Sequence, residues 1–321
     1  MHTKQVILHQ KNEIGQAEEA GRRYREIAKS ANTRKAYQID WSQYLDWCNR
    51  NNKQPIPADI ETIEEYIIYL ADDRQLKPST IRRKVSSLAM AHRSASLGDP
   101  TKHERIKMTL QGIERTKGVR PDGKKPISVD DLKKMVNTLD DSIKGIRDRA
   151  LLLLGFAGAF RRSELSGLNI EDLDFTQDGL KVLVRRSKTD QSGEGHVKGI
   201  LYGSISDTCP IRSLKKWIDS AKIETGALFR AVDRHGNIKQ KRLDGVMIAR
   251  IVKQVAKKAG LDYQRISAHS LRAGFVTSAA LAGNPEWLIM RQTGHKKHDT
   301  VRRYIREVNV LKENASANLG L

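Results

Sequence analysis

The sequence predicts a mainly α-helical protein of two domains, and three observations lead to this prediction. The chain has 321 residues, which is enough for two domains of ~100–200 residues each. Apolar residues recur at helical spacing through most of it, and one segment of the second half alternates as a strand does. Between the halves, residues 116–126 hold two Pro, two Gly and four basic residues without an apolar period. We therefore divide the chain into a polar N-terminal tail (1–20), a helical domain (21–117), a basic linker (118–126), a second domain (127–307) and a C-terminal tail or helix (308–321).

The first domain shows the pattern of four amphipathic helices. Trp41 and Tyr44 lie at helical spacing, so the first of these helices has one apolar face. The other three begin near Ile60, at Pro78 and near His103. Proline suits the first turn of a helix because it lacks the N–H that this turn leaves unpaired. We expect these segments to pack into a small all-helical domain.

The second domain combines helices with a small sheet. Its most apolar run, Ala150–Phe160, fits a buried helix at Gly145–Gly158 and is too short to span a bilayer. Leu180–Val184 alternates apolar and polar residues as a strand does, and apolar residues return at Val197–Leu201 after a polar turn. Together with Leu173–Phe175, these segments predict a three-stranded antiparallel sheet. Further helices are expected at Val129–Leu139, Thr208–Ser220 and Leu243–Ala259.

Both halves of the chain are basic. It carries 58 Lys and Arg against 38 Asp and Glu, a formal net charge of +20. Residues 1–126 hold 24 basic and 16 acidic residues, and residues 127–321 hold 34 and 22. Because the excess is not confined to a tail, we favour a two-domain clamp around a polyanion such as duplex DNA over a merely soluble basic surface.

The cysteine count and the N-terminus bear on localisation. The two cysteines, Cys48 and Cys209, fit neither a disulfide framework nor a zinc site, which points to a reducing compartment. The N-terminus lacks the apolar segment of a signal peptide. We therefore expect a cytoplasmic protein with no membrane partner.

The stretch from His269 to Tyr304 carries the most distinctive chemistry. His269 and Arg272 are three residues apart and would share one face of a helix. A later helix would end at Gly294, which places His295 just past it. Two imidazoles, a guanidinium and a phenol could then converge on one phosphodiester. Arg binds phosphate oxygens, His can donate or accept a proton near neutral pH, and Tyr can attack the phosphorus. Taken singly, a His-x-x-Arg pair or a lone Tyr is usually an ordinary surface or packing feature.

Two more candidates lie upstream. Arg161 directly follows the most apolar run, and a buried cation there needs an anionic partner. That partner is either Glu164, three residues on, or a phosphate of a ligand. Lys188 lies at the start of the polar turn between two predicted strands, where it could reach a ligand.

In chain order, this set resembles the active site of the tyrosine site-specific recombinases, also called the phage integrase family. Residues 161–165, RRSEL, resemble the family's first arginine box, and the first domain is similar to the core-binding domain of Cre-like members. His295 agrees with most of the family, whereas Cre has Trp there. The resemblance covers nearly the whole chain and rests on six positions at family-like spacing: Arg161, Lys188, His269, Arg272, His295 and Tyr304.

The resemblance implies a DNA strand transferase with a covalent 3′-phosphotyrosine intermediate. Tyr304 would be the nucleophile. The attack places extra negative charge on the non-bridging phosphate oxygens, and Arg161 and Arg272 are fixed cations that could bind them. His295 would add another hydrogen-bond donor.

The proton transfers and the cofactors follow from the same residues. A Tyr hydroxyl has a reference pKa of ~10, so it needs a base, and His269 is the candidate. The leaving 5′ oxygen needs a proton, and Lys188 is the candidate acid. Glu164 is expected to support Arg161 or a neighbouring His. No cofactor, metal ion or ATP is expected, because cations already neutralise the charge and the phosphotyrosyl bond would conserve the energy of the broken linkage.

The resemblance also implies the partners. These would be double-stranded DNA with a short inverted-repeat target site and a homo-tetramer on two such sites, with strand exchange through a Holliday junction. The free protein would be a monomer or weak oligomer, nucleoid-associated and of prokaryotic, phage or plasmid origin. After Tyr304, four apolar residues recur at spacings of three and four, and we slightly favour their packing on a neighbouring protomer: Val308, Leu311, Ala315 and Leu319.

Basic clusters on expected helices are candidate contacts to phosphates or base edges, although a solvated charged face explains any one cluster equally well. The run Lys239–Arg242 precedes a predicted helix and is a plausible groove reader. The candidates are Arg34, Lys35, Arg82, Arg83, Lys84, Lys241 and Arg242.

Three alternatives to a recombinase stay open. A type IB topoisomerase would use the same catalytic set without a specific second site. A sequence-specific DNA-binding protein could have kept the fold and lost catalysis. A telomere resolvase usually carries large extra domains, for which this chain has little room.

Overall fold

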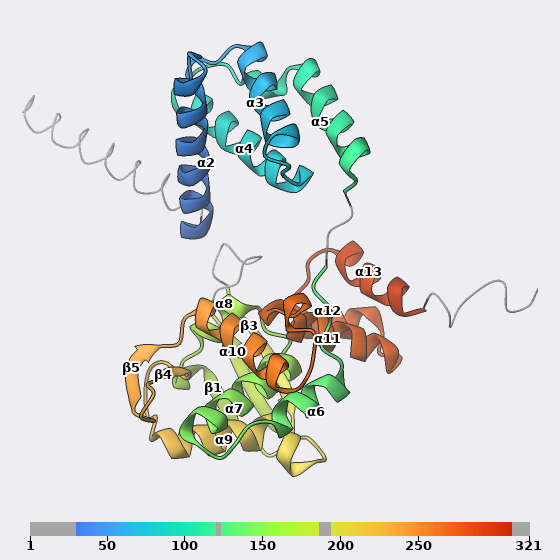
Figure 1. Cartoon of the computed structure of the whole chain (residues 1–321). Coiled ribbons are helices and arrows are strands. Elements are labelled where there is room, and N and C mark those ends of the chain that lie inside the picture. Colours follow the sequence, from blue (N-terminus) through green and yellow to red (C-terminus); the bar gives the residue numbers. More distant parts are fainter. Residues whose placement is uncertain (1–29, 120–122, 186–193, 310–321) are drawn as a thin grey trace, which may run out of the picture. The chain divides into compact units, whose positions relative to one another are not determined.

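The computed structural model of the chain describes residues 30–119, 123–185 and 194–309. Its internal contacts divide the chain into two compact units, residues 1–121 and residues 122–321 (Figure 1). The predicted mainly helical class with a small antiparallel sheet is confirmed. The predicted N-terminal tail lies outside the described residues, as do most of the C-terminal segment and residues 120–122 of the linker, so those domain boundaries stay predictions.

Side chains cap the first turns of two helices of the first unit, α2 and α3. The Ser30 hydroxyl accepts from the backbone N–H of Thr33 at 3.3 Å, and the Asp59 carboxylate accepts from that of Thr62 at 2.6 Å. Helix α4 begins at Pro78, as predicted. The helices are α2 (Ala31–Arg50), α3 (Ile60–Asp72), α4 (Pro78–Ser94) and α5 (Glu104–Lys117), with a short 3₁₀ turn, η1 (Pro100–Lys102), before α5.

Aromatic side chains from α2 and α3 dominate the core of this unit. The rings of Tyr44 and Tyr66 meet edge-on with centroids 4.9 Å apart, and those of Trp47 and Tyr66 lie 5.1 Å apart. Ile81 and Leu88 from α4 are fully buried against them. The aromatic and aliphatic faces of these helices are therefore core rather than binding surface.

The second unit places one buried helix at its centre. Helix α7 (Ile143–Ala157) is the helix predicted from the most apolar run, and it packs against α9 (Pro210–Ala221) and α11 (Ala268–Leu281). Gly274 on α11 approaches Ile127 so closely that an added Cβ would lie 1.9 Å from its carbonyl oxygen, so a larger residue cannot fit. The other helices of the unit are α6 (Val129–Asn137), α8 (Arg162–Gly167), α10 (Gly245–Lys258), α12 (Glu286–Thr293) and α13 (His298–Asn309), with short 3₁₀ turns η2 (Ile170–Asp172), η3 (Ser206–Thr208) and η4 (Tyr263–Arg265).

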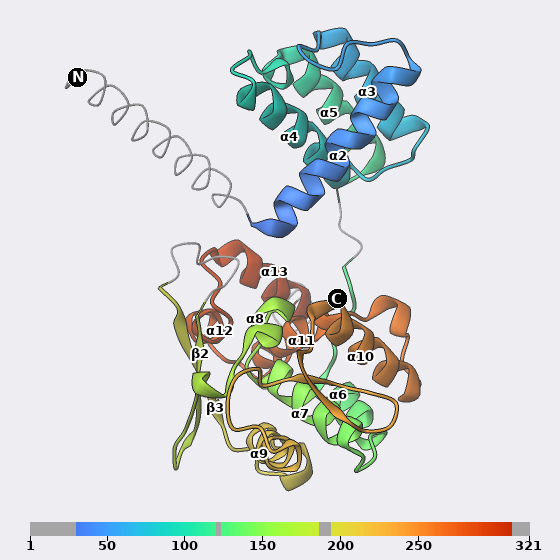
Figure 2. The same cartoon turned by 90° about the vertical axis from the view of Figure 1, so that its left-hand side faces the viewer.

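The predicted three-stranded sheet is present and antiparallel. Strands β2 (Gly179–Val184) and β3 (His196–Leu201) run side by side (Figure 2), and β1 (Leu173–Phe175) pairs with the other edge of β2. The register pairs Val182 with Lys198 across β2 and β3, so both side chains lie on the buried face. Residues 186–193 of the connection, including Lys188, lie outside the described residues.

A two-stranded ribbon, which the sequence did not predict, follows α9. It pairs β4 (Arg230–Val232) with β5 (Ile238–Arg242). The run Lys239–Arg242 therefore lies in a strand and does not lead directly into a helix, because α10 begins later, at Gly245, with Asp244 as its cap. The interpretation of this run as the entry to a groove-reading helix is wrong in that respect.

The last three helices form a small cluster of their own. Helix α13 packs on α11 and α12 (Figure 1), around the buried side chains of Val276, Ile289 and Val301. Tyr304 packs against the same cluster. This arrangement joins the helix of the predicted nucleophile to the helix that carries His269 and Arg272.

Candidate active site

Arg161 and Glu164 form the first part of the site at the start of α8. The Glu164 carboxylate accepts from the backbone N–H of Arg161 at 2.9 Å and from its guanidinium Nη1 at 2.6 Å. The Glu164 side chain is fully buried and that of Arg161 is 15% exposed. Burial alone would raise the pKa of the Glu164 carboxyl, but Lys198 and the bonds to Arg161 lower it below its usual value. Of the two partners predicted for Arg161, the internal carboxylate is therefore present.

Arg272 lies buried beside this pair. It is 1% exposed, although arginine is almost never fully buried unless its charge is paired. Its Nη1 donates to the carbonyl oxygen of Ala159 at 2.7 Å, and its Nη2 lies 3.1 Å from His295 Nε2. Burial and the neighbouring charge of Arg161 lower the pKa of Arg272 to about 10, so it stays charged at neutral pH. The structure thus holds the second predicted arginine rigidly, next to the first.

The partners of His295 define its tautomer. Arg272 can only donate, so Nε2 of His295 accepts, and the ring proton is on Nδ1. Nδ1 then donates to the Thr293 hydroxyl at 2.8 Å, and that hydroxyl donates to the carbonyl oxygen of Ile289 at 2.8 Å. Burial and then the charges of Arg272 and Arg161 lower the pKa of His295 to about 3. His295 is therefore neutral, and its Nε2 accepts from Arg272 in the structure. Its predicted role as a donor to a phosphate oxygen stays a prediction.

His269 lies one helical turn before Arg272 on α11. Part of its side chain is accessible to solvent, yet the surrounding protein and then the charges of Arg272 and Arg161 lower its pKa below the usual value. A neutral imidazole at pH 7 can accept a proton, which is the chemistry expected of a general base.

Tyr304 reaches the same region from α13. It is partly buried against the cluster of α11, α12 and α13, and it lies near enough to Arg272 for its phenolate form to raise the pKa of that guanidinium. Tyr304 also has a contact partner within the protein, so it is not free. The structure therefore brings five of the six predicted positions together: Arg161, His269, Arg272, His295 and Tyr304. The sixth, Lys188, lies outside the described residues, and the roles of all six stay predictions.

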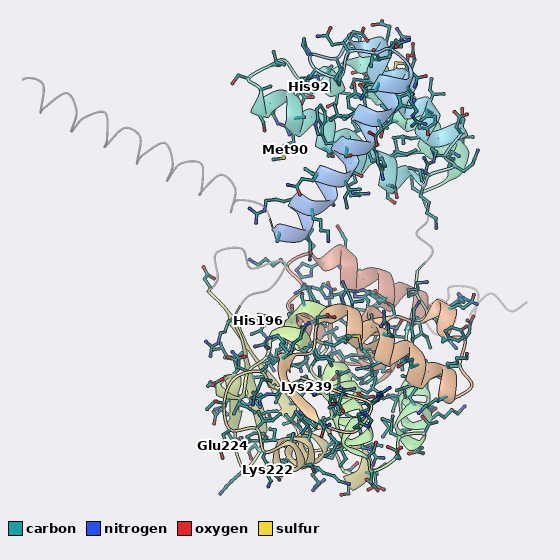
Figure 3. The ribbon with its side chains drawn as sticks, turned by 60° about the vertical axis from the view of Figure 1, so that its left-hand side comes forward. Met90, His92, His196, Lys222, Glu224 and Lys239 are labelled. Carbon is teal, nitrogen blue, oxygen red and sulfur yellow. The ribbon has the colours of Figure 1, made fainter. Side chains whose placement is uncertain are left out.

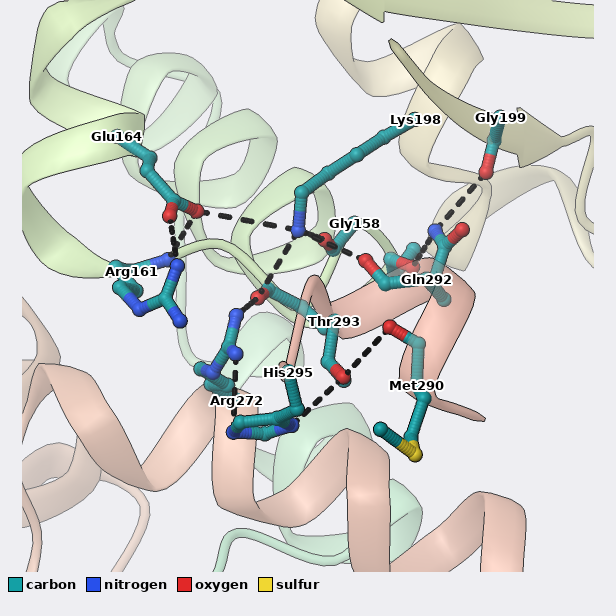
Figure 4. Close-up of polar contacts among 12 residues, drawn as sticks. Gly158, Arg161, Glu164, Lys198, Gly199, Arg272, Met290, Gln292, Thr293 and His295 are labelled. Carbon is teal, nitrogen blue, oxygen red and sulfur yellow. Dashed lines mark hydrogen bonds and ion pairs between the residues drawn. The ribbon is translucent and has the colours of Figure 1, made fainter. Parts of the chain in front are cut away.

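The sequence analysis missed a second lysine in the site, Lys198. Its Nζ donates to the carbonyl oxygens of Gly158 at 2.8 Å and Gln292 at 2.9 Å, and lies 3.9 Å from the Glu164 carboxylate (Figure 4). Burial lowers the pKa of Lys198 to about 7, although Glu164 acts to raise it. Its burial follows from the register of β2 and β3, which places this lysine opposite the buried Val182 and which the residue spacing does not reveal.

Internal partners hold part of the predicted DNA-contacting set in the first unit. Arg82 pairs with Glu114, and Arg83 and Lys84 both pair with Asp40. The side chains of Arg82 and Arg83 remain 51% and 42% exposed, whereas that of Lys84 is only 6% exposed. Lys84 thus has the least surface to offer a ligand. The assignment of this cluster, with Arg34 and Lys35, to DNA contacts stays a prediction.

In the basic run of β5, some side chains are also held by internal partners while another is exposed. Arg242 donates to the carbonyl oxygens of Ser166 and Leu168, both at 2.8 Å, so it ties β5 to α8. Lys239 lies 2.9 Å from the Asp233 carboxylate (Figure 3). Lys241 is exposed. The role of Lys241 and Arg242 as DNA contacts also stays a prediction, with Lys241 the more accessible of the two.

An apolar pocket with a volume of about 710 Å³ lies on the outer face of β3, against α11 and α12. Val197 and Leu201 line it from the strand and are 60% and 75% exposed. Phe275 and Leu288 line it from the helices. Exposed apolar side chains around a pocket of this kind are typical of a binding surface.

The described residues show neither a metal-binding cluster nor a membrane-spanning helix. In residues 30–119, 123–185 and 194–309, no three His, Cys, Asp or Glu side chains are grouped so that they could bind a metal ion. Over the same ranges, no helix combines the length and apolar character needed to cross a membrane.

Comparisons with known proteins agree with this architecture. Residues 125–309 match the family model described as the phage integrase family. The chain is 41% identical over 294 residues to the integrase/recombinase XerD homologue of Selenomonas ruminantium, an alignment that covers 90% of this chain and 86% of that protein. It is 24% identical over 282 residues to the Cre recombinase of Escherichia phage P1, covering 82% and 80%.

Solved structures with the same fold include two integrases bound to DNA. The integrase of the Tn1549 transposon, in complex with transposon right end DNA, matches with a TM-score of 0.58 at 17% identity, over 89% of this chain and 94% of that one. A lambda integrase dimer bound to a COC′ core site matches with a TM-score of 0.56 at 17% identity, over 88% and 93%.

Proposed function

Because the chain belongs to the phage integrase family of tyrosine recombinases, we propose that it cuts and rejoins DNA at a specific site through a 3′-phosphotyrosyl bond to Tyr304. One observation carries this proposal. The described part of the site gathers three cationic side chains around a single carboxylate, that of Glu164, beside the helix of Tyr304. The three cations are Arg161, Lys198 and Arg272.

The charge imbalance favours an anionic ligand. Glu164 carries one negative charge against the two guanidinium groups of Arg161 and Arg272, and the charges of both arginines lower the pKa of His269 and His295. A phosphodiester supplies a negative charge, and its phosphorane transition state supplies more. Fixed donors in a poorly hydrated site stabilise that additional charge without having to reorient. The two guanidinium groups therefore suit the transition state better than the ground state.

The strand cleavage balances as a transesterification. The Tyr304 oxygen forms a bond to phosphorus, the bond from phosphorus to the 5′ oxygen breaks, and the 5′ oxygen leaves as a hydroxyl. His269 accepts the phenol proton, since its lowered pKa keeps it neutral at pH 7. Lys188, from the connection between β2 and β3, donates the proton to the leaving oxygen.

His295 changes partners on this proposal. Its Nε2 accepts from Arg272 in the structure, with the proton on Nδ1. Its contribution to the free enzyme is to orient Arg272. A hydrogen bond from His295 to a phosphate oxygen requires the proton to move to Nε2 when the phosphate displaces Arg272 from that nitrogen.

The rest of the cycle needs no external energy source. The phosphotyrosyl ester retains the energy of the broken phosphodiester, so the 5′-hydroxyl of a second duplex can attack it directly. Two such exchanges in a tetramer on two inverted-repeat sites would pass through a Holliday junction. The relatives support recombination as the overall reaction, since the XerD homologue aligns with 90% of the chain. The tetramer and the Holliday junction are part of the proposal.

The apolar pocket on β3 supports a link between protomers. We propose that residues 308–321 pack on a neighbouring copy, with the pocket lined by Val197 and Leu201 as the receiving surface. The segment carries apolar residues at helical spacing, and the pocket offers an apolar lining of matching character. Such a contact would couple the activity of neighbouring active sites.

Trapping on DNA tests the proposed function. A library of duplexes with random sequence flanking a nick is incubated with the protein, so that the cleaved fragment diffuses away and the covalent complex accumulates. The DNA attached to protein is then sequenced. We expect enrichment of an inverted repeat, a free 5′-hydroxyl on the released fragment, and no covalent complex with Tyr304→Phe.

Two results would contradict the proposal. Covalent complexes on unrelated sequences, with relaxation of any supercoiled plasmid by a monomer, would identify a type IB topoisomerase. Specific binding with no covalent complex at any enriched site would identify a DNA-binding protein without catalysis.

A further inference from the structure

Lys198 is buried where the strand pattern would normally place an apolar residue. Its side chain is 0% exposed, whereas its neighbour Val197 is 60% exposed. Across the sheet it faces Val182, which is fully buried. Burying an ammonium group is costly unless all of its N–H groups are bonded. A methionine or leucine would fill this position without that cost, so the contacts of the ammonium need an explanation.

Those contacts use the whole ammonium group. Nζ donates to Gly158 O at 2.8 Å and to Gln292 O at 2.9 Å, and it lies 3.4 Å from Ala159 O. The Glu164 carboxylate lies beyond, at 3.9 Å. An ammonium has three N–H groups, and three carbonyl oxygens take them up. Lys198 therefore has no donor left for DNA, which distinguishes it from the proposed acid Lys188.

Each segment that Lys198 touches holds a different candidate catalytic group (Figure 4). The carbonyl of Ala159 accepts from Arg272, and Glu164 accepts from Arg161. Gln292 immediately precedes Thr293, whose hydroxyl accepts from His295. One ammonium thus joins the turn after α7, the start of α8 and the end of α12.

The end of α12 is bonded to its neighbours by a second side chain besides Lys198, that of Gln292. Carbonyls in the last turn of a helix lack intrahelical partners, and a cation is favourable there. The Gln292 side chain adds two hydrogen bonds, since its amide donates to Ala157 O at 3.0 Å and to Gly199 O at 2.9 Å. The end of α12, the end of α7 and strand β3 are therefore bonded together around Lys198.

We propose that Lys198 is a positioning residue for strand cleavage, which sets the relative placement of Arg161, Arg272 and His295. It does so through hydrogen bonds to the backbone after α7 and at the end of α12, and through its ion pair with the Glu164 side chain in α8. The inference rests on the proposed function, and it extends that function to a residue that touches neither DNA nor Tyr304. Because β3 also follows the connection that contains Lys188, the same bonds anchor the strand next to the proposed acid.

The test uses the full chain and a nicked duplex carrying the site found by trapping. The covalent complex is measured in a single turnover at saturating DNA, and the dissociation constant is measured separately. Lys198→Met keeps most of the length of the side chain and removes its charge. We expect cleavage about 100-fold slower, the usual effect of a shift of about 1 Å in catalytic groups, with the dissociation constant changed by less than about threefold. Lys181→Met is the matched control on the neighbouring strand, because Lys181 is 61% exposed.

The pH profile separates positioning from simple loss of stability. Lys198 from β3 and Arg161 at the start of α8 lower the pKa of the Glu164 carboxyl, and Arg272 faces them from α11. Without Lys198, Glu164 takes up a proton at higher pH and releases Arg161. The acid limb of the cleavage rate should therefore move to higher pH in Lys198→Met. It should stay in place in Lys198→Arg, which keeps a cation and should recover about tenfold of the lost rate.

Each outcome decides a different point. A wild-type protein that forms no covalent complex overturns the proposed function, and this inference with it. A wild type that cleaves, with Lys198→Met equal to it in rate and pH profile, overturns the role of Lys198 alone. If Lys198→Met fails to fold by circular dichroism, the folded Lys198→Arg decides: a slower rate at an unchanged dissociation constant supports positioning, and an unchanged rate refutes it.

Discussion

Replacing Glu164 by Gln should destabilise the second unit, and the loss should depend on pH. The buried carboxylate lies 3.9 Å from Lys198 Nζ and 2.6 Å from Arg161 Nη1. Glutamine keeps the shape and an oxygen for the backbone N–H of Arg161, but it removes the charge. Lys198 is then left with carbonyl acceptors and no counterion.

The magnitude follows from the separation of the charges. Two unit charges about 4 Å apart attract by about 4 kcal/mol at an effective dielectric constant of about 20. This is an upper limit, because Lys198 has a pKa of about 7 and can lose its proton instead. Glu164 acts to raise that pKa, so the substitution lowers it further. The attraction therefore stabilises the wild type while Lys198 is protonated, below about pH 7, and disappears as the pH rises above it.

Urea titration of the full chain, followed by circular dichroism, measures the difference. We expect Glu164→Gln to lose about 2–4 kcal/mol of unfolding free energy near pH 6. Near pH 8.5 the loss should be about 1 kcal/mol, from the weakened bond to Arg161. Asp174→Asn is the control, since Asp174 and Lys181 form an exposed pair at 3.7 Å that should contribute less than about 1 kcal/mol at either pH. Equal losses at both pH values for Glu164→Gln would refute the reasoning.

Three further substitutions test other parts of the site. In Arg272→Lys, the lysine cannot bond both the carbonyl oxygen of Ala159 and Nε2 of His295, as the guanidinium does. The single-turnover cleavage rate should therefore fall by about 10²–10³-fold with little change in DNA affinity, and an unchanged rate would contradict the role of Arg272. Thr293→Val removes the acceptor of the His295 Nδ1–H, so the Nδ1 proton signal seen in NMR spectra of the wild type should broaden by exchange with water, and cleavage should slow by about tenfold. A wild-type spectrum with the ring proton on Nε2 would disprove the tautomer, and an unchanged cleavage rate would contradict the role of Thr293. Truncation before Val308 should reduce recombination by about tenfold or more, measured in a recombination assay, while the affinity for a single site in a band-shift assay stays within about threefold. Normal recombination by the truncated protein would exclude the docking of the C-terminal segment.

Patterns of short range predicted much of the fold from the sequence. Alternating residues at Leu180–Val184 led to β2, and the apolar run ending at Phe160 led to α7. These predictions succeeded because each element buries one face, and the period of that face is visible in the sequence. The ribbon of β4 and β5 was missed because its strands have only three and five residues and are mostly polar.

The site shows the same division between local and long-range information. Arg161, Arg272 and Tyr304 were found because they stand in motifs of familiar spacing. Lys198 was missed because its burial follows from the register between β2 and β3, which residue spacing alone does not reveal. The tautomer of His295 was also out of reach, since it depends on a contact between residues 23 positions apart.

The most direct test of the account is to identify the residue that becomes attached to DNA. The covalent complex formed on a nicked target duplex is digested with protease and nuclease, and the remaining peptide–nucleotide adduct is sequenced by mass spectrometry. The account predicts a single adduct, with Tyr304 linked to a 3′-phosphate. An adduct on another residue, a 5′ linkage, or an equal yield from Tyr304→Phe would contradict it.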